Sequence, residues 1–279
     1  MSVANFIPEL WSKKILKELD KQHMLVKNCS TTYSGEITGI GSKVKINSID
    51  TPTIDTYTPN STTITPAELV DSSRMLEITE SKYFAFYLDD VDAKQGTGGM
   101  LEEGLRKAVV GLKDLAEQFV ATKFLLAENT VTEAALTSAN VMSTMMDAKV
   151  ILMANNVGMT DMVLEVTPYI WGKMGLGEIA YTDTGKMINK GQFSTMLGMT
   201  VYVSNNLTVT GSGSTVKSMC VMRTKEAIGY AEQIMKTVKY MPENGFKEAI
   251  KGLHVYGAKE IKTSEMVNLE LTNAAETTI

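Results

Sequence analysis

The sequence predicts an α+β fold in which a compact α/β unit is joined to a long helix and to an extended two-stranded arm. Two stretches of alternating apolar and polar residues, 42–49 and 75–90, flank a long tract rich in threonine. A helical stripe of apolar residues runs through 100–129. From residue 131 onward, helix-like and strand-like segments alternate, which is typical of an α/β unit.

The first expected element is a short amphipathic helix near the N-terminus. Pro8 suits the first turn of a helix. Apolar residues then follow at helical spacing: Leu10, Trp11, Ile15 and Leu19. Because this apolar face includes a tryptophan, we expect it to pack against a partner.

The tract between the two predicted strands, residues 50–69, has no helical period and few large apolar side chains. It is rich in threonine and contains Pro52, Pro59 and Pro66. A loop of this length inside a compact domain is uncommon and is usually functional or disordered. Its threonine, isoleucine and Tyr57 content favours extended backbone, so we expect a two-stranded arm that reaches away from the body.

A glycine cluster separates the second predicted strand from the long helix. Asp89, Asp90 and Asp92 precede it and place negative charge beside the proposed anion site, while Met100 and Leu101 follow it where a phosphate loop needs Lys and then Ser or Thr. The stretch also lacks the turn glycine and the final glutamate of a calcium-binding loop, although weak binding of a divalent cation by the three aspartates remains open. The glycines fit best as a hinge and cap before a helix over 100–129, which would be about 45 Å long.

The segments after residue 131 predict a compact α/β unit followed by a returning C-terminal segment. Thr167 and Pro168 suit the N-cap and first turn of a helix. The expected helices are 141–153, one beginning at 168, and 224–235; the expected strands are 162–166, 199–207, 215–222, 253–261 and 266–271. We expect the last two strands to pack against the long helix.

Composition excludes several classes of protein. The chain has 279 residues, 44% of them hydrophobic and 21% charged, which is enough to bury a real core. Its net charge of −5 argues against tight phosphate neutralisation on nucleic acid. Cys29 and Cys220 are too few for a disulfide framework and are expected to be small core residues. We find no membrane-spanning run and no secretion signal, so we expect a cytoplasmic protein.

We identify no catalytic, cofactor or metal site in the sequence. The two histidines, His23 and His254, lack the neighbouring nucleophile or carboxylate motif that catalysis needs, so each is expected to be a surface or hydrogen-bonded residue. One enzymatic alternative stays open: a cytoplasmic enzyme that uses carboxylates such as Asp89, Asp90 and Asp92.

Six local motifs then occur in order along nearly the whole chain. They are FIPELWS (6–12), KVKINSI (43–49), KYFAFYLDDVDAKQ (82–95), VYVSNNL (201–207), AIGYAEQI (227–234) and KGLHVYGAKEI (251–261). With the order of the predicted elements, they resemble the major capsid proteins of tailed bacteriophages with the Hong Kong 97-type fold.

The resemblance implies a division of the chain and a structural function. The implied parts are an N-terminal arm (1–41), an extended loop (42–90), a peripheral domain with the spine helix (91–130 and 238–279) and an axial domain (131–237). Many copies would form pentamers and hexamers of an icosahedral shell around double-stranded DNA, which they would contact non-specifically. The residues implied to contact neighbouring subunits are Trp11, Ile54, Tyr57 and Ile64.

The resemblance also implies partners and a location, with two departures from the family. The implied location is the virion capsid, assembled in the bacterial cytoplasm. Some members cross-link a lysine of the extended loop, but residues 47–81 contain no lysine. The chain leaves no room for a fused scaffolding segment, so we expect a separate scaffolding protein and a portal as partners. An alternative is another phage structural protein such as a tail tube subunit, which the long helical stripe disfavours because tube proteins are dominated by β-structure.

Overall fold

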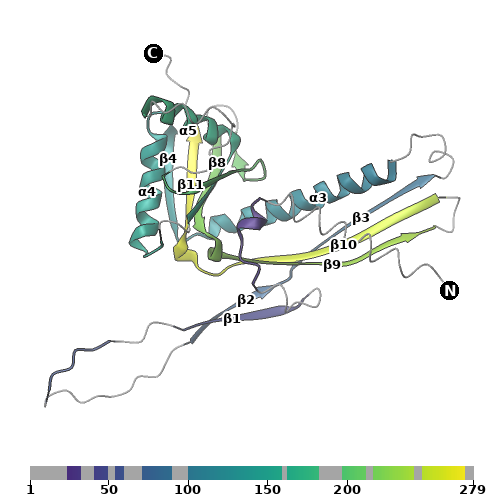
Figure 1. The fold of residues 1–279 in the computed structure, drawn as a ribbon, viewed down its shortest axis with the longest axis horizontal. Helices are drawn as coiled ribbons and strands as arrows, with labels where there is room; N and C mark the ends of the chain where they lie inside the picture. The colour runs from purple at the N-terminus through teal and green to yellow at the C-terminus, as the bar shows by residue number, and fades with distance from the viewer. Residues whose placement is uncertain are drawn as a thin grey trace.

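The protein is described here by a computed structural model, which covers residues 24–32, 41–49, 54–59, 71–89, 100–158, 162–181, 197–211, 216–241 and 247–273. Figure 1 shows a compact lobe, an elongated lobe built around one long helix, and a hairpin that projects away from both. The mixture of helix and sheet confirms the predicted α+β class. Within the described residues, no helix is both long and apolar enough to cross a membrane.

The elongated lobe is a three-stranded antiparallel sheet with a helix along one face. The sheet has the order β3-β10-β9, and the helix is α3. Their bounds are Glu80–Asp89 for β3, Met100–Lys123 for α3, Ile228–Tyr240 for β9 and Lys247–Glu260 for β10. Buried Leu105, Val109 and Leu112 of α3 pack against Phe84 and Phe86 of β3, so the predicted apolar stripe does face a partner.

The long helix is shorter than the sequence predicted. It ends at Lys123 and is followed by a 3₁₀ turn, η4 (Phe124–Leu126), and by strand β4 (Asn129–Leu136). The apolar pattern in the sequence extended past Lys123, since Phe124 is an apolar residue that is also buried in the structure. The backbone nevertheless leaves the helix there, since from Asn129 onward it pairs with β11.

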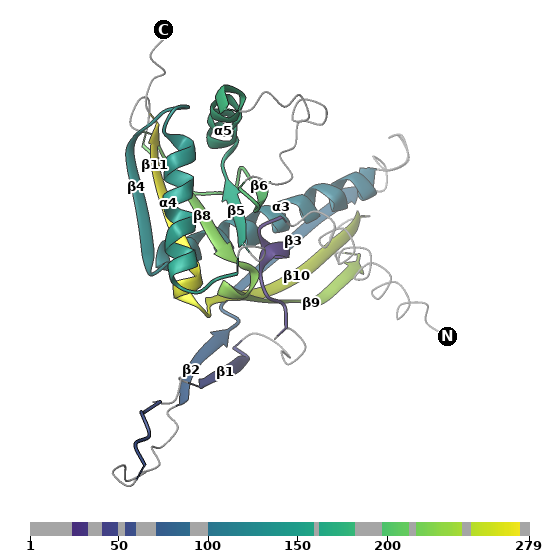
Figure 2. The same cartoon turned by 60° about the vertical axis from the view of Figure 1, so that its left-hand side comes forward.

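The hairpin consists of β1 (Lys43–Ile49) and β2 (Asp71–Glu77), paired in antiparallel register from Lys43↔Glu77 to Ile49↔Asp71. Figure 2 shows it extending from the lower edge of the elongated lobe. The sequence predicted one strand over 75–90, but β2 ends at Glu77 and β3 starts at Glu80. The chain therefore passes from one sheet to another at Ile78, whose side chain is only 1% exposed.

The compact lobe holds a six-stranded mixed sheet of order β4-β11-β8-β5-β6, with β7 paired to β8. Its remaining elements are α4 (Val141–Ala154), β5 (Met162–Val166), α5 (Pro168–Tyr181), β6 (Thr200–Val203), β7 (Val209–Thr210), β8 (Lys217–Thr224) and β11 (Met266–Asn273). Residues of α4 and α5 pack with one face of the sheet in a single apolar core. As predicted, Thr167 caps α5: its Oγ1 accepts a hydrogen bond from the Ile170 N–H at 3.5 Å.

One predicted helix is wrong. The segment 224–235 forms a 3₁₀ turn, η6 (Lys225–Ala227), and then the first part of β9. Tyr230 and Ala231 point to opposite faces of the sheet and are both buried, as expected for a strand covered on two sides. Pairing with β10 from Ile228 to Tyr240 supplies the backbone hydrogen bonds that a helix would have made internally.

Two strands late in the chain, β9 and β11, lie in different lobes. The chain reaches β9 from the compact sheet and returns to that sheet in β11, which lies between β4 and β8. The final strand is therefore an interior strand of the compact sheet, and its Val267, Leu269 and Leu271 pack in the core of that lobe. Met266 shares a core with residues of α3, so the expected packing of 266–271 against the long helix is found at Met266 and not along the rest of the strand. The division into arm, loop, peripheral and axial domains stays a prediction.

Candidate assembly surfaces

The far end of the hairpin carries two of the four predicted contact residues. Ile54 is 89% exposed and Tyr57 is 63% exposed. Figure 1 places residues 54–59 well away from both lobes. The other two, Trp11 and Ile64, lie outside the described residues. Large apolar side chains held this far from the body gain nothing from the chain's own core, so they are available to another molecule.

The base of the hairpin is fixed to the body. Val44, Ile46 and Leu76 pack in a small apolar core with Ala231 and Val255 of the three-stranded sheet. Arg74 Nη1 also donates a hydrogen bond to the Glu260 carbonyl at 3.1 Å. The body therefore sets the starting direction of the hairpin.

The three-stranded sheet exposes an aromatic face on the side opposite α3. Because side chains alternate along β3, Phe84 and Phe86 face the helix while Tyr83 and Tyr87 face outward, 78% and 63% exposed. An apolar hollow of ≈ 320 Å³ lies on this sheet, lined by Tyr83, Ala85, Val238, Lys251, Gly252 and Leu253. We call Tyr83, Tyr87 and Tyr240 with this hollow the aromatic face.

Lysine side chains lie over the aromatic face and give it positive charge. Lys247 Nζ is 4.4 Å from the centroid of the Tyr87 ring, and Lys251 Nζ is 4.8 Å from that of Tyr240. Such cation–π contacts hold the ammonium groups close to the tyrosine rings. The loop between β1 and β2, in contrast, contains three carboxylates and no Lys or Arg: Asp50, Asp55 and Glu68. In the described part of this loop, Asp55 is exposed between Ile54 and Tyr57, so its charge is opposite in sign to that of the lysines on the aromatic face.

The predicted alternative of a carboxylate site gains no support from the described residues. Asp89 ends β3, whereas Asp90 and Asp92 lie outside the described part. No group of three or more His, Cys, Asp or Glu that could hold a metal ion occurs among the residues that the structure describes.

The one described histidine is a buried structural residue. His254 is 1% exposed, and its Nε2 lies 3.1 Å from Glu232 Oε2. The same carboxylate oxygen accepts the Tyr230 hydroxyl at 2.8 Å. Burial and this neighbouring carboxylate raise the pKa of Tyr230 well above its ordinary value, so it stays a neutral donor. His23 lies outside the described residues.

Both cysteines are buried, as predicted. Burial raises the pKa of the Cys29 thiol to about 11 and that of Cys220 to about 12. Neither thiol is therefore a reactive thiolate near neutral pH.

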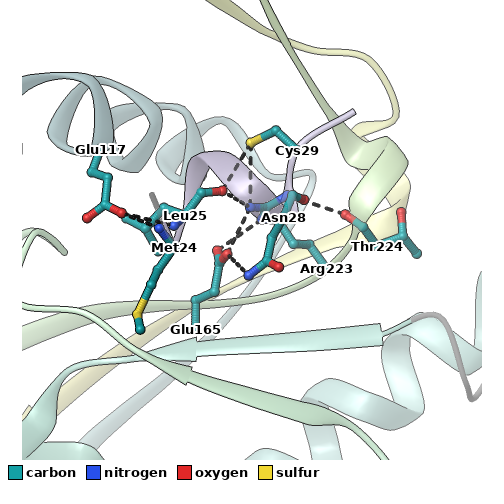
Figure 3. A network of polar contacts seen from close by, with 8 residues as sticks. All are labelled: Met24, Leu25, Asn28, Cys29, Glu117, Glu165, Arg223 and Thr224. Atoms are coloured by element: carbon teal, nitrogen blue, oxygen red, sulfur yellow. Dashed lines mark hydrogen bonds and ion pairs between the residues drawn. The ribbon is translucent and has the colours of Figure 1, made fainter. Parts of the chain in front are cut away.

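A buried polar cluster lies where the two lobes meet (Figure 3). Arg223 of β8 and Glu165 of β5 form a two-bond ion pair, Nε–Oε2 at 3.0 Å and Nη2–Oε1 at 2.9 Å, with both side chains 0% exposed. Asn28 Nδ2 donates a third hydrogen bond to Glu165 Oε1 at 2.9 Å. Burial raises the pKa of Glu165, while Arg223 and Asn28 act to lower it.

Sequence reasoning missed both this cluster and the aromatic face. The signal for the cluster was a charged residue next to an apolar run in each of two strands: Glu165 in MVLEV, and Arg223 directly after MCVM. The signal for the face was the alternation of Tyr and Phe in KYFAFYL, which gives a strand two aromatic sides.

Comparison with solved structures finds the same fold in chains from phages, from a phage capsid structure and from a virus-like particle. A chain of Mycobacterium phage Che8 matches with a TM-score of 0.77 at 22% identity, over 89% of this chain and 91% of the phage chain. A chain from the capsid structure of cyanophage P-SCSP1u matches with a TM-score of 0.70 at 12% identity, over 85% of each chain. A virus-like particle from Pyrococcus furiosus matches at 0.57 and 15% identity, over 94% of this chain and 99% of the other.

No protein-family model and no curated protein matches the sequence. The structural matches show that the chain has the Hong Kong 97-type phage capsid fold, which the sequence predicted.

Proposed function

We propose that this chain is a major capsid protein, many copies of which form the pentamers and hexamers of an icosahedral shell around phage double-stranded DNA. The observation that carries the proposal is the match to the Che8 chain over 89% of this chain and 91% of that one. A match over so much of both chains concerns the whole architecture rather than one shared domain.

The contact between subunits is the hairpin of one copy on the aromatic face of the next. Ile54 and Tyr57 supply apolar side chains, and the hollow beside Tyr83 supplies an apolar surface to receive them. The acidic loop and the lysine-covered sheet attract each other, which favours the correct orientation. Because the hairpin points away from its own body, it leaves its own aromatic face free for a neighbour.

The proposed capsid function also implies how the protein contacts DNA, which partners it has and where it is found. The net charge of −5 favours weak, non-specific contact with the packaged DNA. A scaffolding protein and a portal are the proposed assembly partners, and the virion capsid, assembled in the host cytoplasm, is the proposed location. The role is structural rather than catalytic, and the absence of lysine from residues 47–81 disfavours cross-linking through the loop.

Negative-stain microscopy of the expressed protein, with and without the products of its neighbouring genes, tests the proposal. We expect closed particles of uniform size in at least one condition. Open tubes would favour the tail tube alternative, and a uniform monomer under every condition would contradict the proposal. Substrate turnover that disappears when Asp89, Asp90 and Asp92 are replaced by Asn would favour the enzymatic alternative.

A further inference from the structure

Residues 24–30 are bound largely through their main chain, by side chains from both lobes. From α3, Glu117 Oε1 accepts the backbone N–H groups of Met24 at 2.6 Å and Leu25 at 3.3 Å. From β8, Arg223 donates to the carbonyl oxygens of Leu25 at 3.2 Å and Asn28 at 2.6 Å. Figure 3 shows the segment lying between Glu117 on one side and Arg223 on the other.

The end of the same segment joins the edge of β9. The Ser30 N–H donates to the Ile228 carbonyl at 2.9 Å, and the Tyr230 N–H donates to the Ser30 carbonyl at 2.9 Å. Leu25 and Val26, 0% and 5% exposed, belong to the apolar core that also contains residues of α3, β8, β9 and β10. The segment is therefore held by hydrogen bonds at both ends and by apolar burial between them.

The ion pair at the centre of this site depends on the segment. A buried guanidinium and carboxylate are stable only when their remaining donors and acceptors are also hydrogen-bonded. Here the carbonyls of Leu25 and Asn28 accept from Arg223, and the Asn28 amide donates to Glu165. Without the segment, part of the ion pair would be left desolvated and unsatisfied, so binding of the segment and stability of the pair are coupled.

The bound segment also bridges the junction of the two lobes. Among the residues described after position 100, the chain passes between the lobes three times, each time through a 3₁₀ turn: η4, η6 and η7 (Thr263–Glu265). Such single turns are short connectors between larger elements. Residues 24–30 contact Glu117 on the elongated side and Arg223 on the compact side, and so link the two sides independently of these turns.

We propose that Glu117, Glu165 and Arg223 are positioning residues for the N-terminal arm in assembly. They bind residues 24–30, fix the point at which residues 1–23 join the body, and restrain the two lobes relative to each other. The proposal rests on the proposed function, because the arm needs a fixed origin only if it must meet a neighbouring subunit at a defined place.

The test combines amide hydrogen exchange in the unassembled subunit with particle yield. In Glu117→Ala, the Met24 and Leu25 amides lose their acceptor, and we expect their exchange to accelerate about tenfold. We expect the yield of closed particles to fall in parallel. Glu117→Gln keeps one acceptor oxygen for the Met24 and Leu25 amides but loses the Oε2 that accepts a hydrogen bond from Asn206 Nδ2 at 2.6 Å, so it should restore part of the amide protection and part of the particle yield. Asn28→Ala, which removes one hydrogen bond to Glu165, is the milder variant to use if Glu117→Ala does not fold.

Asn140→Ala is the matched control. Asn140 hydrogen-bonds Thr137 and Ala135 inside the compact lobe and does not contact residues 24–30, so its loss should change neither their exchange nor the particle yield. The inference would be wrong if the Met24 and Leu25 amides of Glu117→Ala exchanged at the parental rate. It would also be wrong if a variant in which these amides exchange freely still formed normal particles. If the parental protein forms no particles, the proposed function fails instead, while the exchange measurement still tests the binding of the segment.

Discussion

Loss of the Arg223 side chain should strongly destabilise the subunit. Arg223→Met removes the cation beside Glu165, leaves that carboxylate buried and takes donors from the carbonyls of Leu25 and Asn28. We expect the free energy of unfolding, measured with urea on the unassembled subunit, to fall by about 3–5 kcal/mol. The double variant Arg223→Met with Glu165→Leu should lose less than the single one, because no charge remains buried. If the double variant lost more free energy of unfolding than Arg223→Met alone, this explanation of the ion pair would be wrong.

The loss of free energy of unfolding caused by Arg223→Met should also depend on pH. Burial raises the pKa of Glu165 above its ordinary value of 4.5, and in this variant Arg223 no longer opposes the rise. A carboxyl whose folded pKa is raised destabilises the protein as pH increases above the unfolded pKa. Relative to the double variant, Arg223→Met should therefore lose stability from about pH 4.5 upward and recover it below. A difference between the two variants that stays flat from pH 4 to 8 would contradict the buried-charge explanation.

The buried pair shows what a sequence can and cannot predict for single residues. Glu165 and Arg223 each stand in an apolar strand, so each could be recognised as needing a partner. Their partnership could not be predicted, because 58 positions separate them and the remaining contacts come from the backbone of residues 25 and 28. Backbone acceptors carry no side-chain signal at all.

At the scale of elements, local periodicity correctly predicted the helices and the strand that share one apolar core. The helices α4 and α5 and the strand β5 lie where the sequence placed them, because each buries its apolar residues against one core. The β9 segment was predicted as a helix because Ala, Glu, Gln and Met favour one. Its strand conformation is imposed by β10, a distant partner whose pairing overrides a weak local preference.

Two glycines should respond in opposite ways to replacement by alanine. Gly111 lies in α3, and a Cβ there would meet nothing within 4 Å, so Gly111→Ala should raise the free energy of unfolding by about 0.5–1 kcal/mol. At Gly257 of β10, a Cβ would lie 2.3 Å from the Glu77 carbonyl oxygen. Gly257→Ala should therefore push the hairpin base away from the sheet and cost about 1–3 kcal/mol. Urea unfolding of both variants checks this, and equal effects of the same sign would contradict the packing described.

The aromatic face should matter to assembly and little to the subunit alone. Tyr83 is 78% exposed, so Tyr83→Ser should change the free energy of unfolding by less than about 0.5 kcal/mol. If a neighbour's hairpin covers this face, the same variant should assemble poorly when followed by sedimentation. Tyr83→Phe keeps the ring and should assemble normally. Normal particles from Tyr83→Ser would remove the face from the proposed interface.

On the scale of the whole molecule, the order of the elements along the chain could be predicted from the sequence. The assignment of the late strands to the two sheets could not. Many helix and strand segments follow the sequence patterns, the β9 segment being an exception, yet the assignment of β9 and β11 to the two sheets depends on pairings between distant residues. Because β11 lies in the middle of the compact sheet, that sheet cannot close until nearly the whole chain has been made. Such non-local closure is expected to make folding of this lobe slow.

The hairpin loop offers the sharpest test of the whole-molecule interpretation. Ile49 and Asp71 are directly paired, so replacing residues 50–70 with Asn-Gly would join them by a two-residue turn of the kind that hairpins favour. The described residues of the loop, 54–59, belong to none of the described apolar cores, and a shorter loop closes with a smaller loss of entropy. The shortened subunit should therefore unfold at an equal or higher urea concentration than the parent.

The same variant should fail to form stable closed particles, because it has lost the segment that reaches the neighbouring subunit. Ile54→Ser with Tyr57→Ser, at full loop length, separates the two contributions: it should weaken assembly if the apolar contacts matter and preserve it if reach alone suffices. Sedimentation and microscopy of the three proteins give the answer. Robust closed particles from the shortened chain would show that the hairpin does not interlock subunits. Outright unfolding would show instead that the loop contributes to the core, since a subunit that has lost only an external contact must still fold.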